Sequence, residues 1–227
     1  MQAYNLWPPT MEKHVTGGRR KFRREGADLR RSALVRATLD LIAEEGVRGA
    51  TVRAIAERAE VTQGLIRHYF STKEDLVLAA YLEHMAGLTE QTFATVERGG
   101  NARTRLVALV VASVTPPVVD AASVGLWAGF LNHVRQDERM REVHARTYHE
   151  FRDRLETLIV AALEEAGRVI GTGQARRLAI ACNAVIDGLW LEGGALPEAF
   201  EAGELPGIAL KSVGAILGLN LERGEQI

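Results

Sequence analysis

The twenty residues from Thr51 to Phe70 constrain the fold most, because they form two short amphipathic segments that meet at a tight corner. In the first segment, apolar side chains recur at spacings of three and four residues, which places them on one face of a helix. They are Val52, Ile55, Ala56 and Ala59. In the second segment Ile66 and Phe70 lie four residues apart, so we expect them to pack inward with Val61. Thr51 and Thr62 are suitable N-caps. The spacing predicts a helix-turn-helix, whose second helix can enter the major groove of DNA.

The segments on either side of this corner are also helical in pattern. Upstream, an inward apolar stripe predicts a supporting helix that ends at Gly46. Its members are Leu34, Ala37, Leu41 and Ile42. Downstream, Ser71 and Glu74 have capping-box spacing, so a further helix is expected to begin near Thr72. Lys73 then falls in its first turn, where an ammonium group and free backbone N–H groups can hold a phosphate.

With these residues the sequence resembles the TetR family of transcriptional regulators over roughly Leu29 to Leu82. The matching stretches are ATLDLIAEEG (37–46), TVRAIAERAEV (51–61) and TQGLIRHYFSTKEDL (62–76). The resemblance implies an all-α protein that represses transcription in response to a ligand. Its expected parts are a flexible basic extension (1–27), a helix-turn-helix DNA-binding domain (28–72) and a helical effector-binding and dimerisation domain (73–227).

Two positions depart from the family pattern. The family usually has glycine where this chain has Glu60, so we expect an ordinary turn with slightly more strain. The family often has tyrosine where this chain has Arg67, which could grip a phosphate or reach a guanine edge. The residues expected to contact DNA are Thr51, Arg53, Thr62, Gln63, Gly64, Arg67, His68, Tyr69 and Lys73.

Charge is divided unevenly along the chain. The net charge of −1 argues by itself against a nucleic-acid partner, but residues 1–73 carry +6 and the remainder −7. A basic end and an acidic end are expected when only one of them meets phosphate. The run GGRRKFRR at 17–24 reads either as a solvated tail or as an arm that follows the DNA backbone or enters the minor groove. Residues 1–10 read equally as a disordered extension or as a mis-assigned start.

Composition indicates a soluble cytoplasmic protein without a membrane partner. Of the 227 residues 47% are apolar, which is enough for a substantial core. The single cysteine, Cys182, excludes an intrachain disulfide and is expected to serve packing. The sequence shows neither an apolar run judged long enough to span a membrane nor the apolar core of a signal peptide.

The C-terminal two thirds of the chain predicts a helical bundle. Glycine and proline breaks separate six periodic stretches, and short connections between long helices favour a bundle. The expected helices are 74–97, 102–115, 119–135, 139–168, 174–192 and 205–220. The last two are more apolar than half-exposed helices need to be. By the resemblance they pair two subunits, and a homodimer is also expected because one recognition helix reads only a few base pairs.

The aromatic residues of this domain are few and clustered. They can be ordinary core and interface residues, or the wall of a pocket that holds a quaternary ammonium ion by cation–π attraction. The candidates are Trp127, Phe130, Tyr148, Phe151 and Trp190. The stretches GLIRHYF (64–70), GLWAGF (125–130) and AVIDGLWL (184–191) resemble the BetI-type branch of the family, which implies choline or betaine aldehyde as the effector. Asp187 or Glu192 could balance the cation, and Asp187 could equally serve the dimer interface. An unrelated small hydrophobic or cationic ligand is the alternative.

Other classes of function find less support in the sequence. The segment 171–173 (GTG) follows a helix rather than a strand, so it reads as a connector and not as a phosphate-binding loop. His133, His144 and His149 have no metal-binding spacing and are expected to be solvated. We therefore expect no catalytic residues, no cofactor, no metal and no enzymatic activity. An architectural DNA-coating protein remains a non-regulatory alternative, although coating does not need a large acidic domain.

Overall fold

The computed structural model describes residues 17–96 and 100–222, and within these ranges its regular elements are all helical. This confirms the predicted all-α fold. The helices are α1 (Gly17–Gly49), α2 (Val52–Arg58), α3 (Gln63–Tyr69), α4 (Lys73–Phe93), α5 (Ala102–Ser113), α6 (Ala121–Val134), α7 (Glu138–Glu165), α8 (Thr172–Ala195) and α9 (Glu204–Leu217), with a 3₁₀ turn at Pro197–Ala199.

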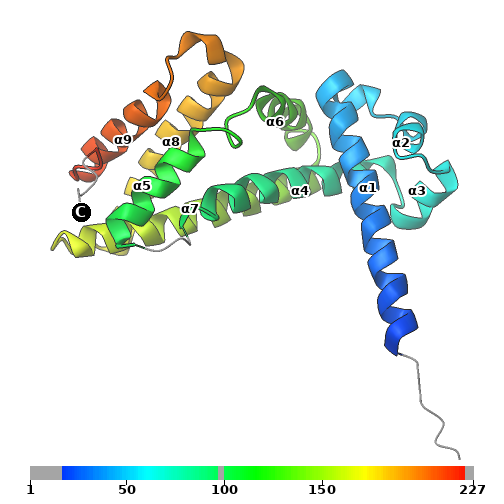
Figure 1. Cartoon of the computed structure of the whole chain (residues 1–227), viewed down its shortest axis with the longest axis horizontal. Coiled ribbons are helices and arrows are strands. Elements are labelled where there is room, and N and C mark those ends of the chain that lie inside the picture. The colour runs from blue at the N-terminus through cyan, green and yellow to red at the C-terminus, as the bar shows by residue number, and fades with distance from the viewer. Residues whose placement is uncertain (1–16, 97–99, 223–227) are drawn as a thin grey trace, which may run out of the picture.

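The helix α1 supports the corner that α2 and α3 form (Figure 1). Its inward stripe is buried as predicted, and its regular path ends at Gly46, which has a φ of 72°. The expectation of a flexible extension over 1–27 is wrong for residues 17–27, because α1 already begins at Gly17. That stretch holds no proline and many arginines, which are good helix formers. Residues 1–16 lie outside the described part of the chain.

All six helices expected after the corner are present, but several ends differ. The glycines of 193–197 were expected to end α8, which instead runs on to Ala195. A Cβ on Gly194 would come within 2.3 Å of Val124 Cγ2, so this glycine serves the close approach of α8 to α6. The capping box of α4 is also one residue further on than predicted. The Asp75 N–H donates to Thr72 Oγ1 at 3.0 Å, and the Thr72 N–H donates to Asp75 Oδ2 at 3.1 Å.

Two hydrophobic cores hold the molecule together. The first joins the inner faces of α1, α2 and α3 to α4, α6 and the start of α7, with Leu34, Ile55 and Tyr81 fully buried. The second joins α5, α7, α8 and α9 around residues such as Leu155 and Val213. In Figure 1 the α1–α3 end lies on the right and the α5–α9 bundle on the left, with α4 reaching from one to the other. Cys182 is buried in the second core, as predicted.

One sequence expectation about membranes needs correction. By length and composition α8 is apolar enough to cross a membrane. The same property is found in core helices of domains, and α8 packs against α6, α7 and α9. These contacts bury about a third of its most apolar stretch, so packing within the subunit accounts for only part of its apolar character.

Candidate nucleic-acid interface and ligand pocket

The corner between α2 and α3 is built from short-range hydrogen bonds. Thr51 Oγ1 accepts from the Ala54 N–H and Thr62 Oγ1 accepts from the Leu65 N–H, so both predicted N-caps are confirmed. Between the helices, Val61 N–H donates to Ala56 O, and Glu60 N–H donates to Glu57 O. This pair of bonds is the Schellman motif, which normally has glycine at the position of Glu60.

Glu60 therefore occupies a strained position. Its φ is 53°, in the left-handed region that favours glycine, and it is the only non-glycine residue with positive φ in the described chain. The expectation of an ordinary turn is wrong, while the expected strain is present. The motif requires this geometry because it turns the chain within two residues.

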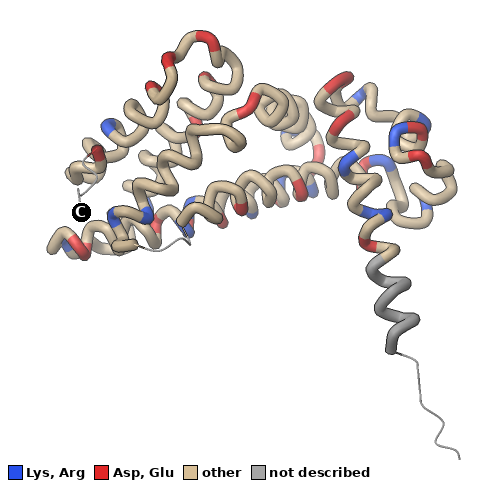
Figure 2. Tube along the Cα trace, viewed as in Figure 1, with Lys and Arg blue, Asp and Glu red and all other residues tan. Residues whose placement is uncertain are grey.

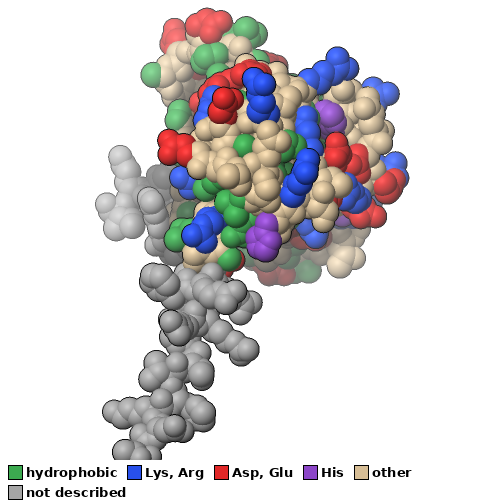
Figure 3. All heavy atoms as spheres, turned by 90° about the vertical axis from the view of Figure 1, so that its right-hand side faces the viewer, with side chains coloured by type: hydrophobic (Ala, Val, Ile, Leu, Met, Phe, Trp, Pro, Cys, Tyr) green, Lys and Arg blue, Asp and Glu red, His purple; other side chains and the backbone are tan. Residues whose placement is uncertain are grey.

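The outer side of the corner presents most of the residues predicted to meet DNA. Seven of the nine are exposed, namely Thr51, Arg53, Thr62, Gln63, Gly64, Arg67 and His68. Tyr69 is half-buried and packs on the first core, with its ring edge-on to His68 at 5.1 Å between centroids. The inward set (Ile55, Ala56, Ile66 and Phe70) is buried as predicted. Figure 2 marks lysine and arginine positions along the backbone of this end of the molecule, and Figure 3 shows their side chains on its surface, interspersed with acidic ones.

Two polar contacts hold the corner to its surroundings. Arg58 makes a two-pronged ion pair with Glu44 of α1, with N–O distances of 2.6 and 3.0 Å. Lys73 is half-buried, and its Nζ donates to the Val47 carbonyl at 3.1 Å. The Lys73 ammonium group thus donates one of its three hydrogens within the protein, and the other two can be donated to an acceptor outside it.

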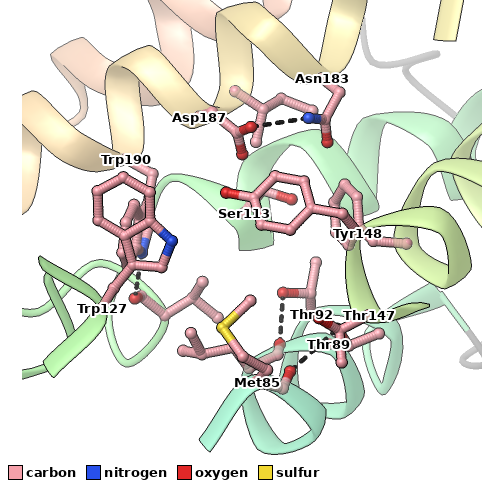
Figure 4. Close-up of a pocket in the computed structure, with 14 residues that line it drawn as sticks. Met85, Thr89, Thr92, Ser113, Trp127, Thr147, Tyr148, Asn183, Asp187 and Trp190 are labelled. Carbon is pink, nitrogen blue, oxygen red and sulfur yellow. Dashed lines mark hydrogen bonds between the residues drawn. The ribbon is translucent and has the colours of Figure 1, made fainter. Parts of the chain in front are cut away.

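A cavity of about 80 Å³ lies where the two hydrophobic cores meet (Figure 4). Its volume is several times the ~10–15 Å³ that one water molecule needs by the same measure. Met85, Trp127 and Tyr148 come from the first core or its edge, while Phe151, Ile186 and Trp190 come from the second. A molecule in this cavity would touch both halves of the protein.

Four of the five aromatic residues singled out from the sequence line this cavity: Trp127, Tyr148, Phe151 and Trp190. The rings of Trp127 and Trp190 meet edge to face, with 5.8 Å between centroids. Phe130 does not line it. It is fully buried in the first core, 4.8 Å from the Tyr81 ring, because it faces α4 rather than α8.

Asp187 is the only charged side chain among the residues that line the cavity. The Asn183 amide donates to Asp187 Oδ2 at 2.7 Å, and burial raises the pKa of this carboxyl to about 6. Burial, together with the nearby Asp187, raises the pKa of Tyr148 to about 12. Glu192, the other carboxylate considered from the sequence, is exposed and does not line the cavity.

Sequence reasoning missed a group of hydroxyls in the cavity wall. Thr89, Thr92, Ser113 and Thr147 are buried, and each donates its hydrogen to a carbonyl of its own helix at 2.8–3.1 Å. Their oxygens are left as acceptors. A signal existed for Thr89 and Thr92, which interrupt the buried apolar face of α4.

A chain of rings connects the cavity to the first core. The His144 ring lies 4.5 Å from the Tyr148 ring, and His144 Nδ1 lies 2.5 Å from the Tyr81 hydroxyl. Burial lowers the pKa of His144, so its ring is neutral at pH 7 and can accept from Tyr81. The expectation that His144 is solvated is therefore wrong. His149, five residues further along α7, is exposed as expected.

The sequence matches two family models. Residues 34–80 match the model described as bacterial regulatory proteins, tetR family, and residues 102–218 match the model of the BetI-type transcriptional repressor C-terminal domain. Among the curated relatives, the HTH-type transcriptional regulator BetI of Burkholderia ambifaria is 33% identical over 170 residues, covering 73% of this chain and 82% of the relative. The BetI regulator of Burkholderia lata is 32% identical over 167 residues, with the same coverage.

Solved structures show the same fold. A transcriptional regulator from Pseudomonas aeruginosa superposes with a TM-score of 0.78 at 31% identity, covering 87% of this chain and 95% of that one. A transcriptional regulator from Saccharomonospora viridis in complex with choline superposes with a TM-score of 0.65 at 20% identity, covering 84% and 96%.

Proposed function

The chain belongs to the TetR family of transcriptional repressors, with a C-terminal domain of the BetI type, and we propose that a small quaternary ammonium compound, choline or betaine aldehyde, releases it from operator DNA. The observation that carries this proposal is the cavity between the two cores, with four aromatic side chains and one carboxylate in its wall.

The wall of the cavity suits a cation that cannot donate hydrogen bonds from its charged end. Aromatic faces attract such a cation, each by about 0.5–2 kcal/mol depending on desolvation. Asp187 supplies the one full opposite charge, and no lysine, arginine or histidine lines the cavity. The choline found in the Saccharomonospora viridis regulator, which shares the fold, is consistent with this choice.

The position of the cavity suits a ligand that regulates DNA binding. We propose residues 28–72 as the DNA-binding domain and 73–227 as the effector-binding and dimerisation domain, with α4 linking them. A ligand between the cores would shift α7 against α4, and the Tyr148–His144–Tyr81 contacts would pass the shift to the first core. A ligand that prefers the released state about a hundredfold supplies about 2.7 kcal/mol of coupling.

The operator contacts follow from the exposed side of the corner. We propose that Thr62, Gln63, Gly64, Arg67 and His68 face the major groove. The remaining contacts, to the adjacent backbone, come from Thr51, Arg53, Tyr69 and Lys73. A Cβ at Gly64 would meet only Thr62 Oγ1, at 3.8 Å, so the protein itself leaves room there for a side chain. The bare backbone at this position allows the helix to approach DNA closely.

We further propose a homodimer that pairs through α8 and α9. Part of the apolar surface of these two helices, including Cys182, Ile186 and Val213, is buried inside the subunit. The exposed side of α8 nevertheless carries a stripe of apolar and small residues: Ile180, Ala184, Gly188 and Leu191. Ile208 lies exposed on the neighbouring α9. Pairing along these helices would place two α3 helices for half-sites about 34–36 Å apart.

The proposal is tested by footprinting the protein on its own upstream DNA with and without ligand. We expect a discrete palindromic footprint that choline or betaine aldehyde removes. Loss of the footprint with an uncharged ligand, but with neither of these cations, would transfer the effector role to another chemical class. Even coverage of the DNA without a palindrome would support a coating protein instead.

A further inference from the structure

The two tryptophans of the cavity differ in what their indole N–H groups do. Trp190 Nε1 donates to the Val118 carbonyl at 2.9 Å. Trp127 Nε1 is buried and has no hydrogen-bond partner. In Figure 4 the Trp127 nitrogen is turned toward the interior of the cavity. The dashed line beside it marks the hydrogen bond that the Trp190 nitrogen donates to the Val118 carbonyl.

The surroundings of Trp127 explain why this donor needs a partner from outside. Its neighbours across the cavity are the Tyr148 hydroxyl and the Asp187 carboxylate, which already accepts from Asn183. The Tyr148 hydroxyl lies near enough to the indole N–H for this contact to lower the Tyr148 pKa slightly against the effect of burial, but the two groups do not meet the geometry of a hydrogen bond. A buried donor left unsatisfied costs about 1–3 kcal/mol, so a site that contains one discriminates in favour of a ligand that satisfies it.

Two other groups of the wall can still donate, namely the Tyr148 hydroxyl and the second amide hydrogen of Asn183. The hydroxyls of Thr89, Thr92, Ser113 and Thr147 donate their hydrogens to backbone carbonyls at 2.8–3.1 Å. Asn183 spends one amide hydrogen on Asp187. Trp127 differs from the Tyr148 hydroxyl because its indole N–H has a fixed direction and can only donate, whereas a hydroxyl rotates and can also accept.

We propose that Trp127 Nε1 is a specificity-determining group, which recognises an acceptor oxygen carried by the cationic ligand. The inference rests on the proposed quaternary ammonium effector and narrows it to compounds with a hydroxyl or carbonyl oxygen beside the ammonium group. The aromatic faces and Asp187 hold the cationic end, while the indole N–H meets the oxygen. Simple tetraalkylammonium ions leave this N–H without a partner.

The test compares choline with propyltrimethylammonium, which has a methyl group in place of the hydroxyl and is otherwise matched in charge and size. Calorimetry gives both dissociation constants for the full-length protein, Trp127→Phe and Trp190→Phe. We expect the unchanged protein to prefer choline about tenfold, as one added hydrogen bond implies. Trp127→Phe should bring the ratio to about one. Trp190→Phe should keep the ratio, whatever it does to both affinities, because its N–H is committed to Val118.

A second measurement does not depend on variants that fold. The chain has three tryptophans, so the indole N–H resonances of the unchanged protein can be followed singly in an ¹⁵N spectrum. Choline should shift one of them downfield, and propyltrimethylammonium should not. Equal affinities for the two cations, or a preference that survives Trp127→Phe, overturns the inference while leaving the proposed function standing. Failure of both cations to bind overturns the two together.

Discussion

At the scale of single residues, Glu60 carries the strain of the DNA-binding corner. The Schellman bonds from Val61 and Glu60 hold the backbone at a φ of 53°. An L-residue with a Cβ loses about 1–2 kcal/mol in this conformation, whereas glycine does not. The corner is thus less stable than its hydrogen bonds would allow.

We expect Glu60→Gly to raise the free energy of unfolding by about 1 kcal/mol, after the greater chain entropy of glycine is subtracted. For a domain of this size the midpoint of thermal unfolding should rise by about 2–4 °C. Glu60→Ala is the matched control, because it removes the carboxylate and keeps the strained φ. Greater stability of the alanine variant than of the glycine variant would contradict the assignment.

Asp187 is the second residue, because the ionisation of its buried carboxyl should make ligand affinity depend on pH. Choline keeps its charge at every pH, so its affinity follows the ionisation of this carboxyl, whose pKa is raised by burial to about 6. We expect the dissociation constant to be constant above about pH 7 and to rise about tenfold per pH unit well below pH 6, as Asp187 takes up a proton. Titration calorimetry from pH 5 to pH 8 measures this.

Asp187→Asn separates this effect from other titrating groups near the pocket. The pKa of Tyr148 is raised to about 12, so this group does not change its charge over this range. The asparagine variant should bind choline weakly at every pH and with a flat profile. A profile as steep as that of the unchanged protein would assign the dependence to another group, such as His144.

At the scale of elements, α7 is the helix that connects the proposed ligand pocket to the end of the molecule proposed to bind DNA. Its Tyr148 lines the cavity, and its His144 meets Tyr81 of α4, whose ring packs against Phe130 of α6. At the start of α7, Arg139 also pairs with Asp75 of the α4 capping box at 2.6 Å. α7 therefore contacts α4 in two places. The Arg139–Asp75 ion pair is polar and exposed, and the His144–Tyr81 contact is aromatic and partly buried.

We expect His144→Ala to bind choline nearly as well as the unchanged protein but to lose much of the choline-induced release of DNA. The reason is that His144 does not line the cavity, yet joins Tyr148 to Tyr81. The measurement is the operator dissociation constant with and without saturating choline, and we expect its ratio to fall about tenfold. His149→Ala, an exposed histidine on the same helix, should leave the ratio unchanged. An undiminished ratio in His144→Ala would remove this route of coupling.

At the scale of the whole molecule, two hydrophobic cores meet at the cavity that we propose as the effector site. One core fixes the corner that we propose meets DNA, and the other fixes α8 and α9. A rigid bundle pairing with a second copy would convert a small rotation of α4 into a change in the spacing of the two α3 helices.

We expect Ile180→Asp to abolish dimer formation in sedimentation equilibrium and to weaken operator binding severely, since a monomer offers one recognition helix. Ile180 is 40% exposed on the outer stripe of α8, so the change should leave the folded subunit intact. Val169→Asp, at a site 89% exposed between α7 and α8, is the control and should remain dimeric. Dimers that persist in Ile180→Asp would place the interface elsewhere.

Local patterns determined much of this protein. The corner, its two threonine caps, the supporting helix and the six later helices all follow from spacings of three and four residues, because helical hydrogen bonds and apolar faces are short-range features of the chain. The capping residue of α4 was missed by one position, since Ser71, Thr72, Glu74 and Asp75 offer two overlapping boxes. The aromatic candidates were also visible, as was the departure at Glu60.

Tertiary structure alone decided which of those residues share a site. Phe130 and Trp127 lie three residues apart on α6, yet one enters the first core and the other lines the cavity. Asn183, Ser113 and Thr147 come from three helices and meet only when these pack. Helical periodicity gives the direction of a side chain relative to its own helix, whereas the neighbour it meets depends on how the helices are placed in space. Whether the Trp127 and Trp190 N–H groups find a hydrogen-bond partner is therefore decided by the packing of the helices and not by the sequence pattern.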